Sequence, residues 1–103
     1  MNVPAEVTAR DARDAVDAGA MLLDVREPWE YAQQHIPGAT LIPLGELPAR
    51  MAEVPEDRDV YVHCRMGGRS ANAVEYLRRS GRPRSANVAG GIEAWVAAEL
   101  PVE

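Results

Sequence analysis

The sequence contains no lysine, so all 11 basic residues among its 103 are arginines. Without a lysine, the chain has no side-chain amine for Schiff-base chemistry and no lysine general base. It also has a single cysteine, Cys64, which excludes a disulfide within the chain and indicates a fold that does not need oxidising conditions.

Long apolar runs and an excess of basic residues are also absent. No stretch approaches the roughly 20 apolar residues of a membrane-spanning helix, and the first six residues lack the basic and apolar regions of a signal peptide. We therefore expect a cytoplasmic protein with no membrane partner. The net charge of −5 argues against a nucleic-acid partner. Length and composition suit a single domain over residues 1–103.

Strand-like and helix-like segments alternate along the chain. We expect strands over residues 3–7, 21–25, 40–42, 60–63 and 86–88. We expect helices between Thr8 and Gly19 and over residues 29–33, 44–52, 70–79 and 92–99. Alternation at this spacing predicts an α/β domain with a mostly parallel sheet of about five strands. Ligands on such sheets bind beyond the carboxyl ends of the strands, which is where Cys64 lies.

Cys64 opens a short glycine-rich loop between a predicted strand and a predicted helix. Gly67 and Gly68 let backbone N–H groups crowd toward one point, and the helix N-terminus adds unpaired N–H groups and a partial positive charge. Arg65 and Arg69 add two full positive charges. We expect all the surroundings of the thiol to favour the thiolate, which makes Cys64 a nucleophile suited to carrying a negatively charged group.

Positive charge gathers in this part of an otherwise acidic chain. Beyond the loop come four more arginines, Arg78, Arg79, Arg82 and Arg84. A local positive field on an acidic protein favours a small anionic substrate. We interpret the four later arginines as the solvated end of a helix.

Four segments, in this order, resemble the rhodanese family. Residues 22–31 (LLDVREPWEY) resemble its L-D-V-R-x-x-x-E-Y/F segment, and residues 35–39 (HIPGA) resemble its H-I-P-G-A turn. Residues 64–70 (CRMGGRS) resemble its active-site loop, and residues 87–95 (NVAGGIEAW) resemble its L-x-G-G-x-x-A-W close. The resemblance implies a rhodanese-like fold, with a central, mostly parallel five-stranded sheet and helices on both faces.

The resemblance also implies a sulfurtransferase that needs no metal or organic cofactor. In such a family, the loop cysteine, here Cys64, takes the outer sulfur of thiosulfate or of a related persulfide donor and carries it as a persulfide. Cyanide or a thiol, including a protein thiol, then removes the sulfur. The persulfide would be held by Arg65, Met66, Gly67, Gly68, Arg69 and Ser70. Thiosulfate, glutathione persulfide, 3-mercaptopyruvate and a partner protein's cysteine stay open as physiological reactants.

Loop length separates this chemistry from that of a related phosphatase and arsenate reductase group. Those enzymes place an arginine six positions after the cysteine, which gives a wider cradle fitted to a tetrahedral oxyanion. Here Arg69 falls five positions after Cys64, and Ser70 occupies the sixth. The shorter loop favours sulfur transfer. A third alternative, a rhodanese-like module that only binds partners, is disfavoured because Cys64 is present.

Three charged residues beyond the first buried strand are predicted to support the loop. We expect Asp24 and Arg26 to form an ion pair that braces the cysteine loop, with Glu30 part of the same bracing; direct contact with substrate is the alternative. Arg69 is expected to point inward and Arg65 toward the substrate anion, although the sequence does not assign either orientation.

Overall fold

A computed structural model describes residues 5–103 and has a five-stranded sheet at its centre. The strands are β1 Glu6–Val7, β2 Met21–Asp24, β3 Thr40–Leu41, β4 Val60–His63 and β5 Ser85–Val88. They lie in the order β1-β5-β4-β2-β3, and every pairing is parallel. The predicted α/β class and five-stranded sheet are confirmed. Of the predicted first strand, residues 3 and 4 lie outside the described residues.

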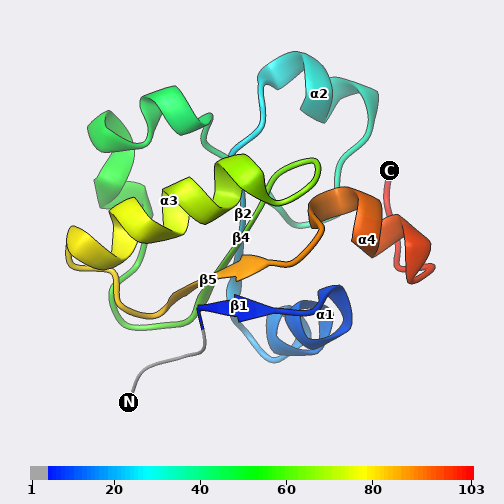
Figure 1. Cartoon of the computed structure of the whole chain (residues 1–103), viewed down its shortest axis with the longest axis horizontal. Helices are drawn as coiled ribbons and strands as arrows, with labels where there is room; N and C mark the ends of the chain where they lie inside the picture. The colour runs from blue at the N-terminus through cyan, green and yellow to red at the C-terminus, as the bar shows by residue number, and fades with distance from the viewer. Residues whose placement is uncertain (1–4) are drawn as a thin grey trace.

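Helices cover both faces of this sheet (Figure 1). They are α1 Ala9–Asp17, α2 Pro28–Gln33, α3 Gly68–Arg79 and α4 Gly91–Ala97, with two 3₁₀ segments, η1 Leu44–Glu46 and η2 Pro48–Glu53. The α3 helix and the 3₁₀ segments pack on one face, whereas α1 and α4 pack on the other. Within residues 5–103, no helix has the length and apolar character needed to cross a membrane.

Alternation within the strands sends neighbouring side chains to opposite cores. Leu23 and Val62 belong to the core beneath α3, whereas Leu22 and Tyr61 belong to the core beneath α1 and α4. All residues of β2, β4 and β5 are buried, which explains why the apolar runs at residues 21–23 and 60–62 are nearly continuous. β2 and β4 pair in parallel with Asp24 opposite His63, so the carboxyl ends of these two strands lie side by side.

The predicted helix over residues 44–52 is wrong. The chain there forms the two separate 3₁₀ segments η1 and η2. Pro48 has no N–H to continue a helix and instead begins the second segment. Arg50 departs from helical geometry, with φ −118° and ψ 21°. The chain therefore does not form one α-helix here, although its apolar residues have helical spacing, because Pro48 lacks the N–H that a continuous helix needs.

Two of the arginines assigned to a solvated helix end instead tie loops together. Arg82 donates to the backbone carbonyls of Val54 and Met51 at 2.6 and 2.9 Å, and its side chain is largely buried. Arg84 pairs with Asp59 at 2.9 Å. These contacts join the segments that precede β4 and β5. They therefore lie at the amino ends of these strands, whereas Cys64 lies at the carboxyl end of β4.

Candidate active site

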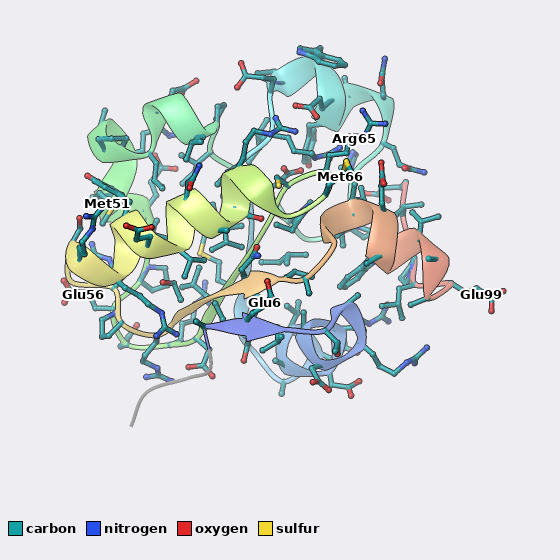
Figure 2. All side chains as sticks on the ribbon, in the orientation of Figure 1. Glu6, Met51, Glu56, Arg65, Met66 and Glu99 are labelled. Carbon is teal, nitrogen blue, oxygen red and sulfur yellow. The ribbon has the colours of Figure 1, made fainter. Side chains whose placement is uncertain are left out.

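Cys64 immediately follows the last residue of β4, at the edge where β2 also ends. The neighbouring strand β2 holds the end of β4 in place, because the N–H of Val25, which directly follows β2, donates to the His63 carbonyl at 3.1 Å. The cysteine is only 2% exposed. Figure 2 shows the next two side chains, Arg65 and Met66, between α2 and α4 and near the surface.

Three hydrogen-bond donors surround the sulfur of Cys64. The backbone N–H of Gly67 lies 3.1 Å from Sγ, the N–H of Ser70 lies 3.4 Å away, and the Ser70 hydroxyl lies 3.3 Å away. Gly67 has φ +112°, a left-handed conformation that glycine adopts without strain. This turn lets α3 begin at Gly68, two residues before the predicted start, and directs N–H groups of its first turn at the sulfur.

The pKa of the Cys64 thiol lies below its ordinary value as the result of opposed effects. Burial raises it and is the largest single influence. Hydrogen bonds from the Ser70 hydroxyl and from the N–H groups of Ser70, Gly67 and Met66 lower it, and together they outweigh burial. The expectation that all the surroundings favour the thiolate is therefore wrong about burial, although the donors prevail.

The two loop arginines are each paired with a glutamate. Arg69 makes a two-pronged contact with Glu30, with its guanidinium nitrogens 2.6 and 2.9 Å from the two carboxylate oxygens. The Arg69 hydrogen bond is the main cause that lowers the pKa of Glu30 to about 2. Arg65 makes a single contact of 2.9 Å with Glu93, and its side chain is 66% exposed. Arg69 is thus turned toward α2, and Arg65 toward solvent.

The Asp24–Arg26 pair lies at the carboxyl end of β2. Both side chains are buried, and their nitrogen and oxygen atoms approach to 2.8–3.1 Å. Arg26 also donates to the Gln34 carbonyl at 2.8 Å. The pair braces the segment that leads into α2, and Glu30 hydrogen bonds with Arg69 rather than with Arg26. Glu30, and not the Asp24–Arg26 pair, therefore supports the cysteine loop directly.

His63 connects the same two strand ends beneath the loop. Its Nδ1 lies 3.1 Å from the Cys64 carbonyl, and its Nε2 lies 3.6 Å from a carboxylate oxygen of Asp24. Burial lowers the pKa of His63 more than the Asp24 charge raises it. Because a carbonyl oxygen can only accept a hydrogen bond, Nδ1 is the donor in the contact with Cys64.

The start of α4 presses against the cysteine loop from the other side. The N–H of Ile92 donates to the Cys64 carbonyl at 2.9 Å, and the N–H of Glu93 donates to the Arg65 carbonyl at 3.2 Å. Gly91 has φ +59°, and a Cβ there would overlap the carbonyl groups of Cys64 and Arg65. Gly91 thus permits a close approach between the backbone at the start of α4 and the backbone of the cysteine loop.

One residue of the site was missed by the sequence analysis. Asn87 on β5 is buried, with Oδ1 2.5 Å from the Ser70 hydroxyl and Nδ2 3.3 Å from the Gly67 carbonyl. The available signal was an amide side chain within a predicted buried strand, which needs hydrogen-bond partners. The partners lie 17 and 20 residues away along the chain, so no local pattern names them.

An open groove runs beside the loop. It is lined by Arg26, Trp29, Glu30, Gln33, Arg65 and Glu93, among others. Trp29 is 63% exposed, and Met66, on the loop itself, is 67% exposed. The buried sulfur is therefore bordered by large apolar side chains that face solvent.

Comparison with known proteins agrees with this architecture. The family model for the rhodanese-like domain matches residues 8–98. A sulfurtransferase of Allochromatium vinosum is 46% identical over 82 residues, which cover 80% of this chain and 77% of that protein. The protein YtwF of Bacillus subtilis is 35% identical over 92 residues, covering 87% of this chain and 88% of that one.

Solved structures give the same result. The crystal structure of a rhodanese-related protein from Thermoplasma volcanium superposes with a TM-score of 0.89 and 34% identity, covering 97% of this chain and 98% of that one. Other relatives are longer, and the chain spans 24%, 60% and 50% of the length of three of them. With the family model matching most of its length, the chain belongs to the rhodanese-like domain family.

Proposed function

We propose that this protein is a sulfurtransferase that carries sulfane sulfur on Cys64. The observation that carries the proposal is the set of donors on Sγ, which come from Gly67 and Ser70. A ring of fixed donors stabilises negative charge on sulfur without having to reorganise during the reaction. The sulfurtransferase among the relatives supports the same conclusion.

In the first step, the Cys64 thiolate attacks the outer sulfur of a donor such as thiosulfate. A sulfur–sulfur bond forms at Sγ, the sulfur–sulfur bond of the donor breaks, and its electron pair leaves with sulfite. The negative charge then resides on the outer sulfur of the persulfide. We assign the N–H groups of the loop 64–70 to hold this charge, and the lowered pKa of Cys64 favours the attacking thiolate.

In the second step, an acceptor takes the outer sulfur. Cyanide or a thiolate attacks that sulfur, and the electron pair of the persulfide bond returns to Sγ. The exposed Trp29 and Met66 beside a recessed sulfur suit an acceptor that brings its thiol on a protein surface. We therefore include a protein thiol among the acceptors.

Phosphate transfer is less well supported by the same geometry. A phosphatase needs a general acid for its leaving group. Glu30 has a pKa of about 2, so it is ionised at neutral pH and has no proton to give. Glu93 pairs with Arg65 at 2.9 Å. The six-residue loop and the charged state of Glu30 both favour sulfur transfer.

The proposal is tested by assaying thiocyanate formation from thiosulfate and cyanide. The wild type is compared with Cys64→Ser and with Ser85→Ala, which alters a buried serine outside the site. A generic phosphatase substrate is run in parallel. We expect thiocyanate from the wild type and from Ser85→Ala, none from Cys64→Ser, and no release of phosphate.

Unchanged thiocyanate formation by Cys64→Ser would overturn the mechanism. Phosphate release without thiocyanate would show that the loop-length argument is wrong. If neither product forms, mass spectrometry of Cys64 after incubation with glutathione persulfide decides between a carrier with another donor and a binding module. A mass increase of one sulfur supports the carrier.

A further inference from the structure

The side chain of Asn87 hydrogen bonds with both of the loop residues that donate to the Cys64 sulfur, Gly67 and Ser70. Its Nδ2 lies 3.3 Å from the carbonyl of Gly67, and its Oδ1 lies 2.5 Å from the hydroxyl of Ser70. The side chain is buried between β5 and α3, and Asn87 as a whole is only 4% exposed. Asn87 is therefore fixed against the floor of the site without contacting the sulfur itself.

The orientation of the amide follows from its neighbours. The Gly67 carbonyl and the carboxylate of Glu6, whose Oε2 is 3.1 Å from Nδ2, can only accept hydrogen bonds. The NH₂ group must therefore face them, which leaves Oδ1 facing Ser70. Figure 2 shows Glu6 on β1, the strand next to β5, which carries Asn87. Both hydrogens of the amide are thus engaged, and its oxygen requires a donor.

Ser70 has one hydroxyl hydrogen for two acceptors, the Asn87 oxygen at 2.5 Å and the Cys64 sulfur at 3.3 Å. When Cys64 is a thiol, its S–H donates to the Ser70 oxygen and the Ser70 hydrogen donates to Asn87, so each group is satisfied. When Cys64 is a thiolate, the hydrogen must turn to the sulfur. The buried Asn87 oxygen then loses its donor, which is unfavourable.

We propose that Asn87 is a positioning residue that draws the Ser70 hydrogen away from Sγ and so favours the persulfide over the bare thiolate. The inference rests on the proposed sulfur transfer. As Sγ bonds to the outer sulfur and sulfite departs with its electron pair, the charge moves from Sγ to the outer sulfur. The Ser70 hydrogen can then return to Asn87, with no proton gained or lost.

Other charged and titratable groups lie around the cysteine loop. Arg69 on α3 is paired with Glu30 of α2, and His63 of β4 contacts the Cys64 carbonyl. Asp24 of β2 lies behind His63, and Glu6 of β1 lies behind Asn87. Arg65 and Glu93 face each other at the surface where α4 begins. A test must therefore separate the Ser70 route from these groups.

The test compares Asn87→Leu in two backgrounds, the wild type and Ser70→Ala. Leucine has nearly the size of asparagine and removes the competing acceptor. The pH dependence of alkylation by iodoacetamide gives the pKa of Cys64 directly, because the chain has one cysteine. We expect Asn87→Leu to lower this pKa by about one unit, a roughly tenfold increase in thiolate below the pKa.

In the Ser70→Ala background, we expect Asn87→Leu to leave the pKa unchanged. A merely structural role of Asn87 would give the same shift in both backgrounds, and that result would overturn the proposal, as would a raised or unaltered pKa in Asn87→Leu alone. Asn72→Leu, which alters an exposed asparagine of α3, is the matched control. Ser85→Ala controls for the loss of a buried hydroxyl.

If Asn87→Leu does not fold, an NMR pH titration of the wild type still tests the proposal. The side-chain amide resonance of Asn87 should shift with the same midpoint as Cys64 during a pH titration, and this shift should vanish in Ser70→Ala. An amide resonance that ignores the Cys64 titration would refute the proposal. These readouts use the free thiol, so a failure of the protein to transfer sulfur would leave them interpretable.

Discussion

Two regions of the site differ in how they are built. The sulfur cradle, formed by Cys64, Gly67 and Ser70, consists of backbone N–H groups and one buried hydroxyl directed at one atom. The rim, formed by Trp29, Arg65 and Met66, consists of side chains that are each more than 60% exposed. The difference teaches that charge on sulfur is controlled by groups held inside the fold, which are backbone N–H groups and the buried hydroxyl of Ser70. The exposed side chains of the rim are the ones that we propose to meet the reactants.

The two arginines of the loop repeat this contrast. Arg69 makes two contacts with a buried carboxylate, and Arg65 makes one contact with an exposed carboxylate. An exposed pair with a single contact contributes little to stability and separates readily. Arg65 is thus available to an incoming anion, whereas Arg69 is committed to the fold beneath it.

The largest expected effect comes from breaking the buried charge pair at the end of β2. Asp24→Ala leaves Arg26 buried without its carboxylate, and we expect the free energy of unfolding to fall by about 3–5 kcal/mol. Urea unfolding measures this loss. Asp17→Ala, which breaks the exposed pair with Arg13, should change stability by less than about 1 kcal/mol. Equal losses in the two variants would contradict the distinction between buried and exposed pairs.

Gly91→Ala should disturb the sulfur cradle through the start of α4, which packs against the cysteine loop. A methyl group there overlaps the carbonyls of Cys64 and Arg65, and alanine disfavours φ +59°. We expect a loss of about 1–3 kcal/mol in stability and at least a tenfold slower alkylation of Cys64. Gly45→Ala is the matched control, because its Cβ would meet nothing within 4 Å. Native alkylation kinetics in Gly91→Ala would show that α4 does not position the loop.

Glu30→Gln tests how much the ion pair between Glu30 and Arg69 contributes to stability. The folded-state pKa of Glu30 is lowered from 4.5 to about 2, so its stabilising contribution is fully present above about pH 4.5 and disappears as pH falls through about 2. We expect the variant to be about 1–2 kcal/mol less stable at pH 7, after allowance for partial exposure of Arg69. Urea unfolding at pH 4 should still give about three quarters of this difference. A difference already lost at pH 4 would mean that the pair is weak.

Arg65→Ala should have the smallest effect on the fold and a selective effect on the substrate. We expect the KM for thiosulfate to rise about two- to fivefold with little change in kcat, because an exposed charge contributes a fraction of a kcal/mol to binding. Steady-state kinetics at low salt measure it. Arg79→Ala, another exposed arginine paired with a glutamate, is the control. An unaltered KM would show that Arg65 does not meet the donor.

Sequence alone predicted the parts of the molecule that local chemistry determines. Buried strands such as Val60–His63 are marked by apolar runs, and the glycine-rich loop after Cys64 is marked by its residue types. The 3₁₀ geometry after residue 44 was not predicted, because an apolar pattern does not register the missing N–H of Pro48.

Hydrogen-bond partners that lie far apart in the chain could not be predicted from the sequence either. Glu30 pairs with Arg69 across 39 residues, and Asn87 meets Ser70 across 17, so only the strand order brings them together. The same reason explains why the pairing of Arg65 with Glu93 was not predicted, and why Glu30, which was expected to brace the loop, was not assigned to Arg69. Chain patterns indicate which residues are buried, but topology decides which of them touch.

The contact of α4 with the cysteine loop has a consequence for local unfolding. Two N–H groups from the first turn of α4 hold the carbonyls of Cys64 and Arg65, so any fluctuation that frays this helix also releases the sulfur site. Helix and site should exchange their amide hydrogens as one cooperative unit. Trp95, buried on the same helix, places an intrinsic fluorophore inside that unit, so its emission reports when the site is open.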